Sequence, residues 1–218
     1  MKSSDPEKTS QNDTYIVSKR SQLRIKIRQQ RRSFSPEQQN QASSGLLEHI
    51  LKEDYFRKAR TLAFYQAFDG EIDPAPAVKK ALELGKRCFL PVLNPGDTSL
   101  AFVEYTLGTS LEKNHFGILE PITYPNNALA PEHMDVIFMP LVAFDIKGNR
   151  LGMGKGYYDK SLAFMLKNVA KVRSSSKNTP TLIGLAHECQ RVDGLERAEW
   201  DVPLDKIITD QTTYTTIS

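Results

Sequence analysis

Short apolar runs recur along the chain, each bounded by turn-forming residues, and they predict strands. The predicted strands cover residues 61–67, 87–93, 100–105, 135–144, 181–186 and 206–209. Most of these runs are apolar at nearly every position instead of alternating with polar residues. Continuous apolar runs are typical of strands buried on both faces of a parallel sheet.

Helical periodicity appears between the strands. Ser35-Pro36-Glu37-Gln38 is a capping box with proline at the first helical position, and it opens a helix whose apolar side begins at Ala42. A second helix through Val78 stops at Gly85. Two more helices are predicted, one through Leu23 and Ile27 and one through Leu162 and Met165. The alternation predicts a single three-layer α/β/α domain over residues 18–218, with a mainly parallel, mixed, Rossmann-like central sheet.

Three segments lack this periodicity. We expect residues 1–17 to form a mobile, disordered leader. Residues 106–132 are rich in Pro, Asn and Gly and are expected to form an irregular excursion over the surface, and residues 167–179 to form a polar loop.

Composition limits the class of protein. The chain has 218 residues, of which 39% are hydrophobic and 25% charged, as expected of a globular α/β protein. Its longest apolar run, Val136 to Phe144, is far shorter than the roughly 20 residues of a membrane span. The first twenty residues have no apolar signal region, so we expect a cytoplasmic protein. Cys88 and Cys189 are too few for a disulfide framework.

Charge is concentrated near the N-terminus. The net charge is +3, and residues 18–33 hold seven basic and no acidic side chains, so the remainder is slightly acidic. A basic helix on an acidic protein indicates either a local anion site or an arm that binds nucleic acid. The chain has no clustered aromatic platform and no RNA-binding signature, which disfavours the second alternative.

The strongest chemical signal is the segment from Arg150 to Asp159, between a predicted strand and a helix. It reads RLGMGKGYYD, and we call it the glycine loop. Three alternate glycines let the backbone approach a ligand and aim several N–H groups at one anion. Arg150 and Lys155 add positive charge, and the following helix adds its N-terminal end. The combination favours a polyphosphate ligand over a glycine turn that only packs closely.

The segment matches neither common phosphate motif. Gly156 stands where a Walker A loop needs Ser or Thr, and the glycine spacing is not that of a dinucleotide loop. Without the Walker hydroxyl, Mg²⁺ needs another oxygen ligand. Asp159 is the candidate, because Mg²⁺ prefers carboxylates, phosphate oxygens and water.

At these residues the sequence resembles the 5-formyltetrahydrofolate cyclo-ligase family. The resemblance covers residues 18–209 in several blocks, which are Arg20–Arg24, Phe68–Asp73, Met139-Pro140, Phe144-Asp145, Arg150–Asp159, Gly184–Ala186, Gln190 and Glu199–Asp205. It implies a ligase that uses ATP and Mg²⁺ to convert 5-formyltetrahydrofolate to 5,10-methenyltetrahydrofolate, releasing ADP and phosphate. It also implies a monomer that acts without nucleic acid or membrane.

The resemblance further implies a role for each matching residue. The nucleotide would contact Arg20, Arg24, Arg150, Gly152, Gly154, Lys155, Gly156, Tyr157 and Tyr158. Lys155 and Arg150 would be catalytic. The folate would contact Gln66, Phe68, Glu71, Met153 and Tyr157, and Asp159 and Asp201 would hold Mg²⁺. Arg20 stands where the family more usually has lysine, and Met153 occupies a variable position.

Other interpretations of single residues remain open. In these interpretations Glu71 is an exposed loop carboxylate, and Asp201 caps a turn. Arg28, Arg31 and Arg32 lie beyond the matching block, and we expect them to be solvated. Trp200 is expected to pack against other side chains.

A different enzymatic function also remains open. An enzyme acting on a phosphorylated metabolite would need the glycine loop but no separate folate-side carboxylate.

Overall fold

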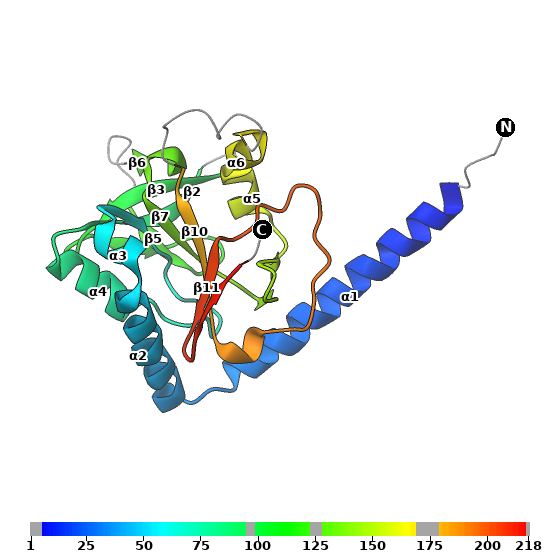
Figure 1. The fold of residues 1–218 in the computed structure, drawn as a ribbon, viewed down its shortest axis with the longest axis horizontal. Coiled ribbons are helices and arrows are strands. Elements are labelled where there is room, and N and C mark those ends of the chain that lie inside the picture. The colour runs from blue at the N-terminus through cyan, green and yellow to red at the C-terminus, as the bar shows by residue number, and fades with distance from the viewer. Residues whose placement is uncertain (1–5, 95–98, 123–127, 169–178, 217–218) are drawn as a thin grey trace.

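The computed structural model describes residues 6–94, 99–122, 128–168 and 179–216. Within them an eight-stranded sheet forms the centre of the molecule (Figure 1). Its strands lie in the order β12 (Thr213–Thr215), β11 (Lys206–Thr209), β10 (Thr181–Ala186), β7 (Val136–Pro140), β1 (Thr61–Ala63), β2 (Arg87–Leu93), β3 (Leu100–Tyr105) and β6 (Ala128–Leu129). The pairings from β11 to β2 are parallel and the outer pairings are antiparallel. The predicted mainly parallel, mixed sheet is confirmed.

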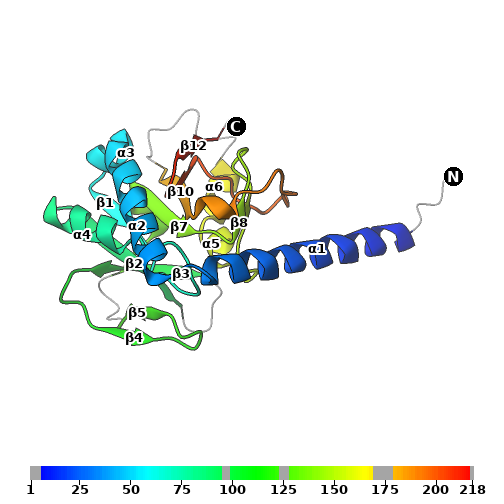
Figure 2. The same cartoon turned by 90° about the horizontal axis from the view of Figure 1, so that it is seen from below.

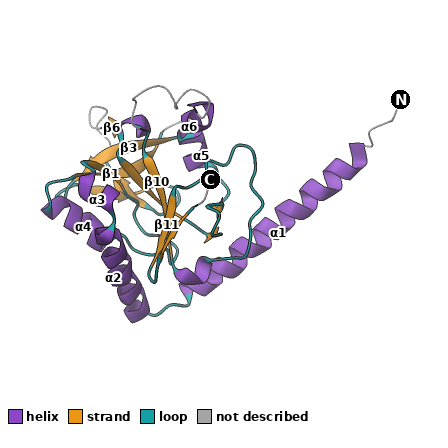
Figure 3. Cartoon of the chain, viewed as in Figure 1, coloured by secondary structure: helices purple, strands orange, loops and turns teal. Residues whose placement is uncertain are grey.

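Helices cover both faces of the sheet (Figure 3). On β1, Leu62 faces the layer of α2 (Pro36–Lys52), α3 (Asp54–Lys58) and α4 (Ala75–Glu83). Its neighbour Ala63 faces α5 (Tyr157–Ser161) and α6 (Ala163–Asn168) on the opposite side. Both side chains are fully buried, which is why the strand runs are apolar at successive positions.

The capping box of α2 forms as predicted. The Ser35 hydroxyl accepts a hydrogen bond from the Gln38 N–H at 3.3 Å, and the Gln38 amide oxygen accepts one from the Ser35 N–H at 2.8 Å. These two bonds satisfy N–H groups that a helix start otherwise leaves unpaired.

The first helix, α1 (Pro6–Arg32), begins earlier than expected and projects from the body of the molecule (Figures 1 and 2). Residues 6–17 are therefore helical where a disordered leader was expected, and residues 1–5 lie outside the described part. Its last turns dock through Ile27, which packs with Val142 and Leu151. Among the described helices, none is both long and apolar enough to cross a membrane.

Two predicted strands are shorter than their apolar runs. The first ends at Ala63 instead of residue 67. The run over residues 135–144 divides at Pro140, which has no N–H to donate to a ladder. Its second part becomes β8 (Ala143–Phe144), which pairs with β9 (Arg150–Leu151) in a separate hairpin that leads into the glycine loop.

The expected irregular excursion over residues 106–132 is largely ordered. It contains the hairpin of β4 (Leu111–Lys113) and β5 (Leu119–Pro121), then β6, and a 3₁₀ turn at Pro131–His133. Figure 2 shows β4 and β5 together at the edge of the molecule. Residues 95–98 and 123–127 lie outside the described residues, and so do residues 169–178 of the predicted polar loop.

Candidate active site

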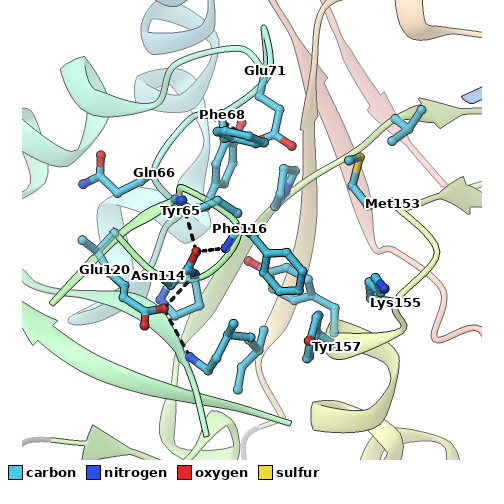
Figure 4. Close-up of a pocket in the computed structure, with 18 of the residues that line it drawn as sticks. Tyr65, Gln66, Phe68, Glu71, Asn114, Phe116, Glu120, Met153, Lys155 and Tyr157 are labelled. Atoms are coloured by element: carbon cyan, nitrogen blue, oxygen red, sulfur yellow. Dashed lines mark hydrogen bonds between the residues drawn. The ribbon is translucent and has the colours of Figure 1, made fainter. Parts of the chain in front are cut away.

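A cavity of about 410 Å³ opens beyond the carboxyl ends of β1, β2 and β7, the edge of a parallel sheet where ligands bind. Three segments surround it, namely residues 65–71 after β1, the β4–β5 hairpin and the glycine loop (Figure 4). All five predicted folate contacts line this one cavity, and so do Lys155, Gly156, Tyr158 and Asp159.

The carboxylate of Glu71 lies at the inner wall and is not an exposed loop group. Only 10% of its side chain is accessible, and one of its oxygens accepts a hydrogen bond from the Phe68 N–H at 3.2 Å. Burial raises the pKa of Glu71 to about 7, and the nearby charge of Arg31 opposes this rise. At neutral pH the carboxyl group is therefore poised between its charged and neutral forms.

The chain turns sharply just before Glu71, where Asp69 binds three arginines of α1. Arg28, Arg31 and Arg32 all donate to the Asp69 carboxylate, and Arg31 also donates to the carbonyls of Asp69 and Leu141 at 2.8 and 3.1 Å. The expectation that these arginines are solvated is wrong for Arg31, whose side chain is fully buried. A buried guanidinium is tolerated because its donors have acceptors.

The glycine loop meets the same helix further toward its N-terminus. Arg24 donates from Nε to the carbonyl of Gly152 at 2.8 Å, and its guanidinium lies 3.5 Å from where a Cβ on Gly154 would be. Gly154 and Gly156 have φ values of +94° and +71°, which side chains rarely adopt. Arg24 of the basic helix therefore lies directly against the glycine loop.

Arg150 faces inward. Its guanidinium donates to the carbonyl of Val202 and to the carboxylate of Asp159, and the residue is 9% exposed. Its contact with a nucleotide therefore stays a prediction, whereas its hydrogen bond to Asp159 is direct.

The helix after the glycine loop, α5, has only five residues. Its dipole therefore adds less positive potential than the sequence suggested.

Burial lowers the pKa of Arg150, and the charges of the two predicted metal ligands, Asp159 and Asp201, oppose this effect. Burial raises the pKa of Asp159, an effect that Arg150 opposes and Asp201 reinforces. Asp201 accepts a hydrogen bond from the Ala198 N–H at 3.0 Å, so it does cap a turn, and it lies 3.7 Å from Arg20.

The donor set suits a cation that arrives with phosphate. In the described part of the chain, no cluster of three or more His, Cys, Asp or Glu side chains could hold a metal alone. Mg²⁺ usually binds through one or two carboxylates together with phosphate oxygens and water, so Asp159 and Asp201 fit that ion as partial ligands.

Sequence reasoning missed the hairpin side of the cavity. Asn114, Phe116, Ile118, Leu119 and Glu120 line it, although the segment was expected to lie on the surface. Asn114 and Gly117 signalled a turn, but no local pattern shows that a turn will fold back over a cavity. The expectation that Trp200 packs is also wrong, since 70% of the residue is exposed.

Residues 16–210 match the family model described as the 5-formyltetrahydrofolate cyclo-ligase family. The chain belongs to this family. It is 38% identical over 191 residues to the 5-formyltetrahydrofolate cyclo-ligase of Haemophilus influenzae, covering 87% of this chain and 97% of the relative. The enzyme of the same name from Escherichia coli K12 is 37% identical over 184 residues, which cover 84% and 96% of the two chains.

Solved structures agree with the sequence relatives. The NMR structure of Aquifex aeolicus 5,10-methenyltetrahydrofolate synthetase superposes with a TM-score of 0.73 at 28% identity, covering 90% of this chain and 92% of that one. A 5,10-methenyltetrahydrofolate synthetase from Mycoplasma pneumoniae shares the fold, with a TM-score of 0.64 at 24% identity and coverage of 88% and 98%. The chain is thus a cyclo-ligase family enzyme, and its cavity is the candidate active site.

Proposed function

We propose that this enzyme converts 5-formyltetrahydrofolate to 5,10-methenyltetrahydrofolate, consuming ATP with Mg²⁺ and releasing ADP and phosphate. The observation that carries the proposal is one cavity with two chemically different walls. Glu71 provides a buried carboxylate on one wall, and Lys155 provides a cation beside the glycine loop on the other. A reaction between a flat heterocycle and a phosphoryl donor needs both walls.

The Glu71 wall suits the pterin. A carboxylate accepts hydrogen bonds from two adjacent N–H donors of a heterocycle, and Phe68 offers an aromatic face beside it. Gln66 and Tyr65 lie along the same wall (Figure 4). Because the pKa of Glu71 is about 7, a ligand that donates N–H hydrogen bonds to this carboxylate shifts it toward the charged form.

The glycine-loop wall suits the triphosphate. Arg24 already lies against the loop, and Arg20 lies beside Asp201, so α1 supplies two cations at the outer side of the nucleotide site. Lys155 is exposed and lines the cavity, where it can neutralise charge on the transferring phosphoryl group. Arg150 orients Asp159, and Asp159 and Asp201 would hold Mg²⁺, which would neutralise charge on the phosphates when bound.

The proposed chemistry has two steps. The formyl oxygen attacks the γ-phosphorus of ATP, the bond to the ADP oxygen breaks, and an imidate phosphate results. N10 then attacks the formyl carbon, a proton leaves N10, and the C–O bond breaks as phosphate departs. The second step is intramolecular, so a cavity that fixes N10 near the formyl carbon contributes much of its rate.

Near-ultraviolet absorbance tests the proposal. The enzyme is incubated with 5-formyltetrahydrofolate, Mg²⁺ and ATP, and parallel samples omit ATP or Mg²⁺. We expect the conjugated methenyl chromophore to grow only in the complete mixture. A folded enzyme that binds ATP and produces no chromophore would overturn the proposal and favour a phosphorylated metabolite as substrate.

A further inference from the structure

The β4–β5 hairpin forms a wall of the cavity to which the proposed reaction gives no role. Its loop carries Phe116, whose ring lies 6.2 Å between centroids from that of Tyr157 at an interplanar angle of 68°. On the other side of the loop, a Cβ on Gly117 would lie 3.9 Å from the ring of Phe68. The loop therefore spans from the Glu71 wall to the glycine-loop wall (Figure 4).

The side chain of Asn114 organises this loop. Its Oδ1 accepts hydrogen bonds from the N–H groups of Phe116 at 2.9 Å and Ile118 at 3.1 Å. The Asn114 N–H donates to the Ile118 carbonyl at 2.9 Å, and its carbonyl accepts from the Gly117 N–H at 2.9 Å. One residue thus fixes the backbone on both sides of Phe116, in the manner of an Asx turn.

Glu120 connects the loop to the main sheet. A single oxygen, Oε2, accepts from the Asn114 side-chain amide at 3.1 Å and from the N–H of Leu93 at 3.4 Å. Leu93 is the last residue of β2, which belongs to the central sheet. A two-stranded hairpin is only marginally stable by itself, so this connection matters for where the loop lies.

We propose that Asn114 is a positioning residue for folate binding, which together with Glu120 holds the ring of Phe116 against the substrate. The inference rests on the proposed function and extends it to the hairpin. A loop that is ordered before binding spares the ligand the entropy cost of ordering it. Loss of the Asn114 side chain leaves Phe116 unchanged but removes the hydrogen bonds that hold the backbone at Phe116 and Ile118.

Two variants measure the effect. Asn114→Ala should raise the KM for 5-formyltetrahydrofolate about tenfold, the equivalent of one or two lost hydrogen bonds, while the KM for ATP changes by less than about twofold. Asn94→Ala is the matched control. It removes an asparagine that bonds Ser99 in another loop and does not line the cavity, and it should leave both KM values unchanged.

Glu120 provides an independent pair. Glu120→Gln keeps an acceptor oxygen in the same place and should retain most of the folate affinity, whereas Glu120→Ala should resemble Asn114→Ala. If Glu120→Gln is as impaired as Glu120→Ala, the charge itself is needed, and the positioning role is overturned. This pair also serves if Asn114→Ala fails to fold.

A double-mutant cycle with Phe116→Ala decides whether Asn114 acts through that ring. Phe116→Ala alone should raise the folate KM about tenfold. In that background, Asn114→Ala should add less than about twofold, because the ring it positions is gone. A purely structural role predicts that the two effects multiply, and multiplied effects would overturn the inference.

The same experiment separates this inference from the proposed function. Methenyl formation by the unmodified enzyme tests the reaction, and the cycle is scored only on changes in folate KM. No turnover by the unmodified enzyme counts against the reaction. Normal turnover with unchanged KM in Asn114→Ala counts against the hairpin alone.

Discussion

Nη2 of Arg31 lies 3.6 Å from Oε1 of Glu71, and the arginine side chain is fully buried. The same guanidinium binds Asp69, two residues before Glu71 in the chain. The helix that carries the arginine therefore helps to position the Glu71 carboxylate and favours its charged form, against the effect of burial.

The affinity for 5-formyltetrahydrofolate should depend on pH through Glu71. Burial raises its pKa to about 7, and in the proposed complex pterin N–H donors bind the ionised carboxylate, so protons compete with the ligand. Below about pH 7 the affinity should fall about tenfold per pH unit. Calorimetry across this range checks the slope. Glu71→Gln should bind 5-formyltetrahydrofolate more weakly, and its folate affinity should not depend on pH in this range. At each pH, the affinity for ATP should be the same in the two proteins.

Glu71 should also impose a pH dependence on stability. Its folded pKa lies above the ordinary 4.5, so between these values the folded state binds more protons than the unfolded state. The contribution of this group to stability is therefore fully present below about pH 4.5 and is lost as pH rises through about 7. Urea unfolding of the unmodified protein and Glu71→Gln, compared at several pH values, isolates this contribution, which should disappear in the variant.

Removing the charge of Arg31 should cost stability and move the folate pH profile. Arg31→Met leaves Asp69 and Glu71 without their buried cation, which costs about 3 kcal/mol or more. In the same variant, the midpoint of the folate pH profile should shift upward, because the opposing charge is lost. Arg32→Met is a control at a half-exposed neighbour that also binds Asp69 but makes no ion pair with Glu71 in the described part of the chain. If the midpoint does not move in Arg31→Met, the pKa of Glu71 is controlled by other groups.

Lys155→Ala should lower turnover about a hundredfold or more, since loss of one group that stabilises transition-state charge has effects of this size. Lys155 is exposed, so thermal unfolding should be unaffected. Lys160→Ala removes another exposed lysine three residues after Tyr157 and is the control for surface charge. Turnover of Lys155→Ala close to that of Lys160→Ala would exclude a catalytic role.

The Mg²⁺ requirement should change when either proposed ligand loses its charge. Asp201→Asn should raise the Mg²⁺ concentration needed for half-maximal turnover about tenfold or more. Asp159→Asn should do the same while still accepting a hydrogen bond from Arg150. Asp193→Asn, at an exposed position eight residues before Asp201, should leave the requirement unchanged. Identical Mg²⁺ curves for all three variants would exclude this site.

Much of the fold follows from local sequence. The apolar runs of β2 and β10 and the capping box of α2 are patterns contained within a few consecutive residues, and the elements form where these patterns predicted them. The division at Pro140 follows from its missing N–H, yet the run of apolar side chains around it concealed the break.

Other features depend on contacts between distant segments. Arg31 is buried only because Asp69 and the carbonyl of Leu141, 38 and 110 residues away, supply acceptors for it. Asn114 reads as an ordinary turn residue, and its place over the cavity depends on Glu120 and β2. The glycine loop was recognisable because its chemistry is concentrated in ten consecutive residues, whereas the hairpin wall has no such concentration.

The span between the two walls depends on the length of α1. Arg24 contacts the glycine loop and Arg31 contacts Glu71. The two arginines are seven positions apart, which makes about two helical turns, or about 10 Å. In the proposed reaction, this spacing along the helix sets the distance between the phosphoryl donor and its acceptor. Inserting a single residue between them would rotate one arginine by about 100° away from its partner, whereas inserting seven would restore the direction but lengthen the span. Single-residue insertions and deletions in this stretch should therefore be absent from active members of the family, while substitutions on its solvent side are tolerated.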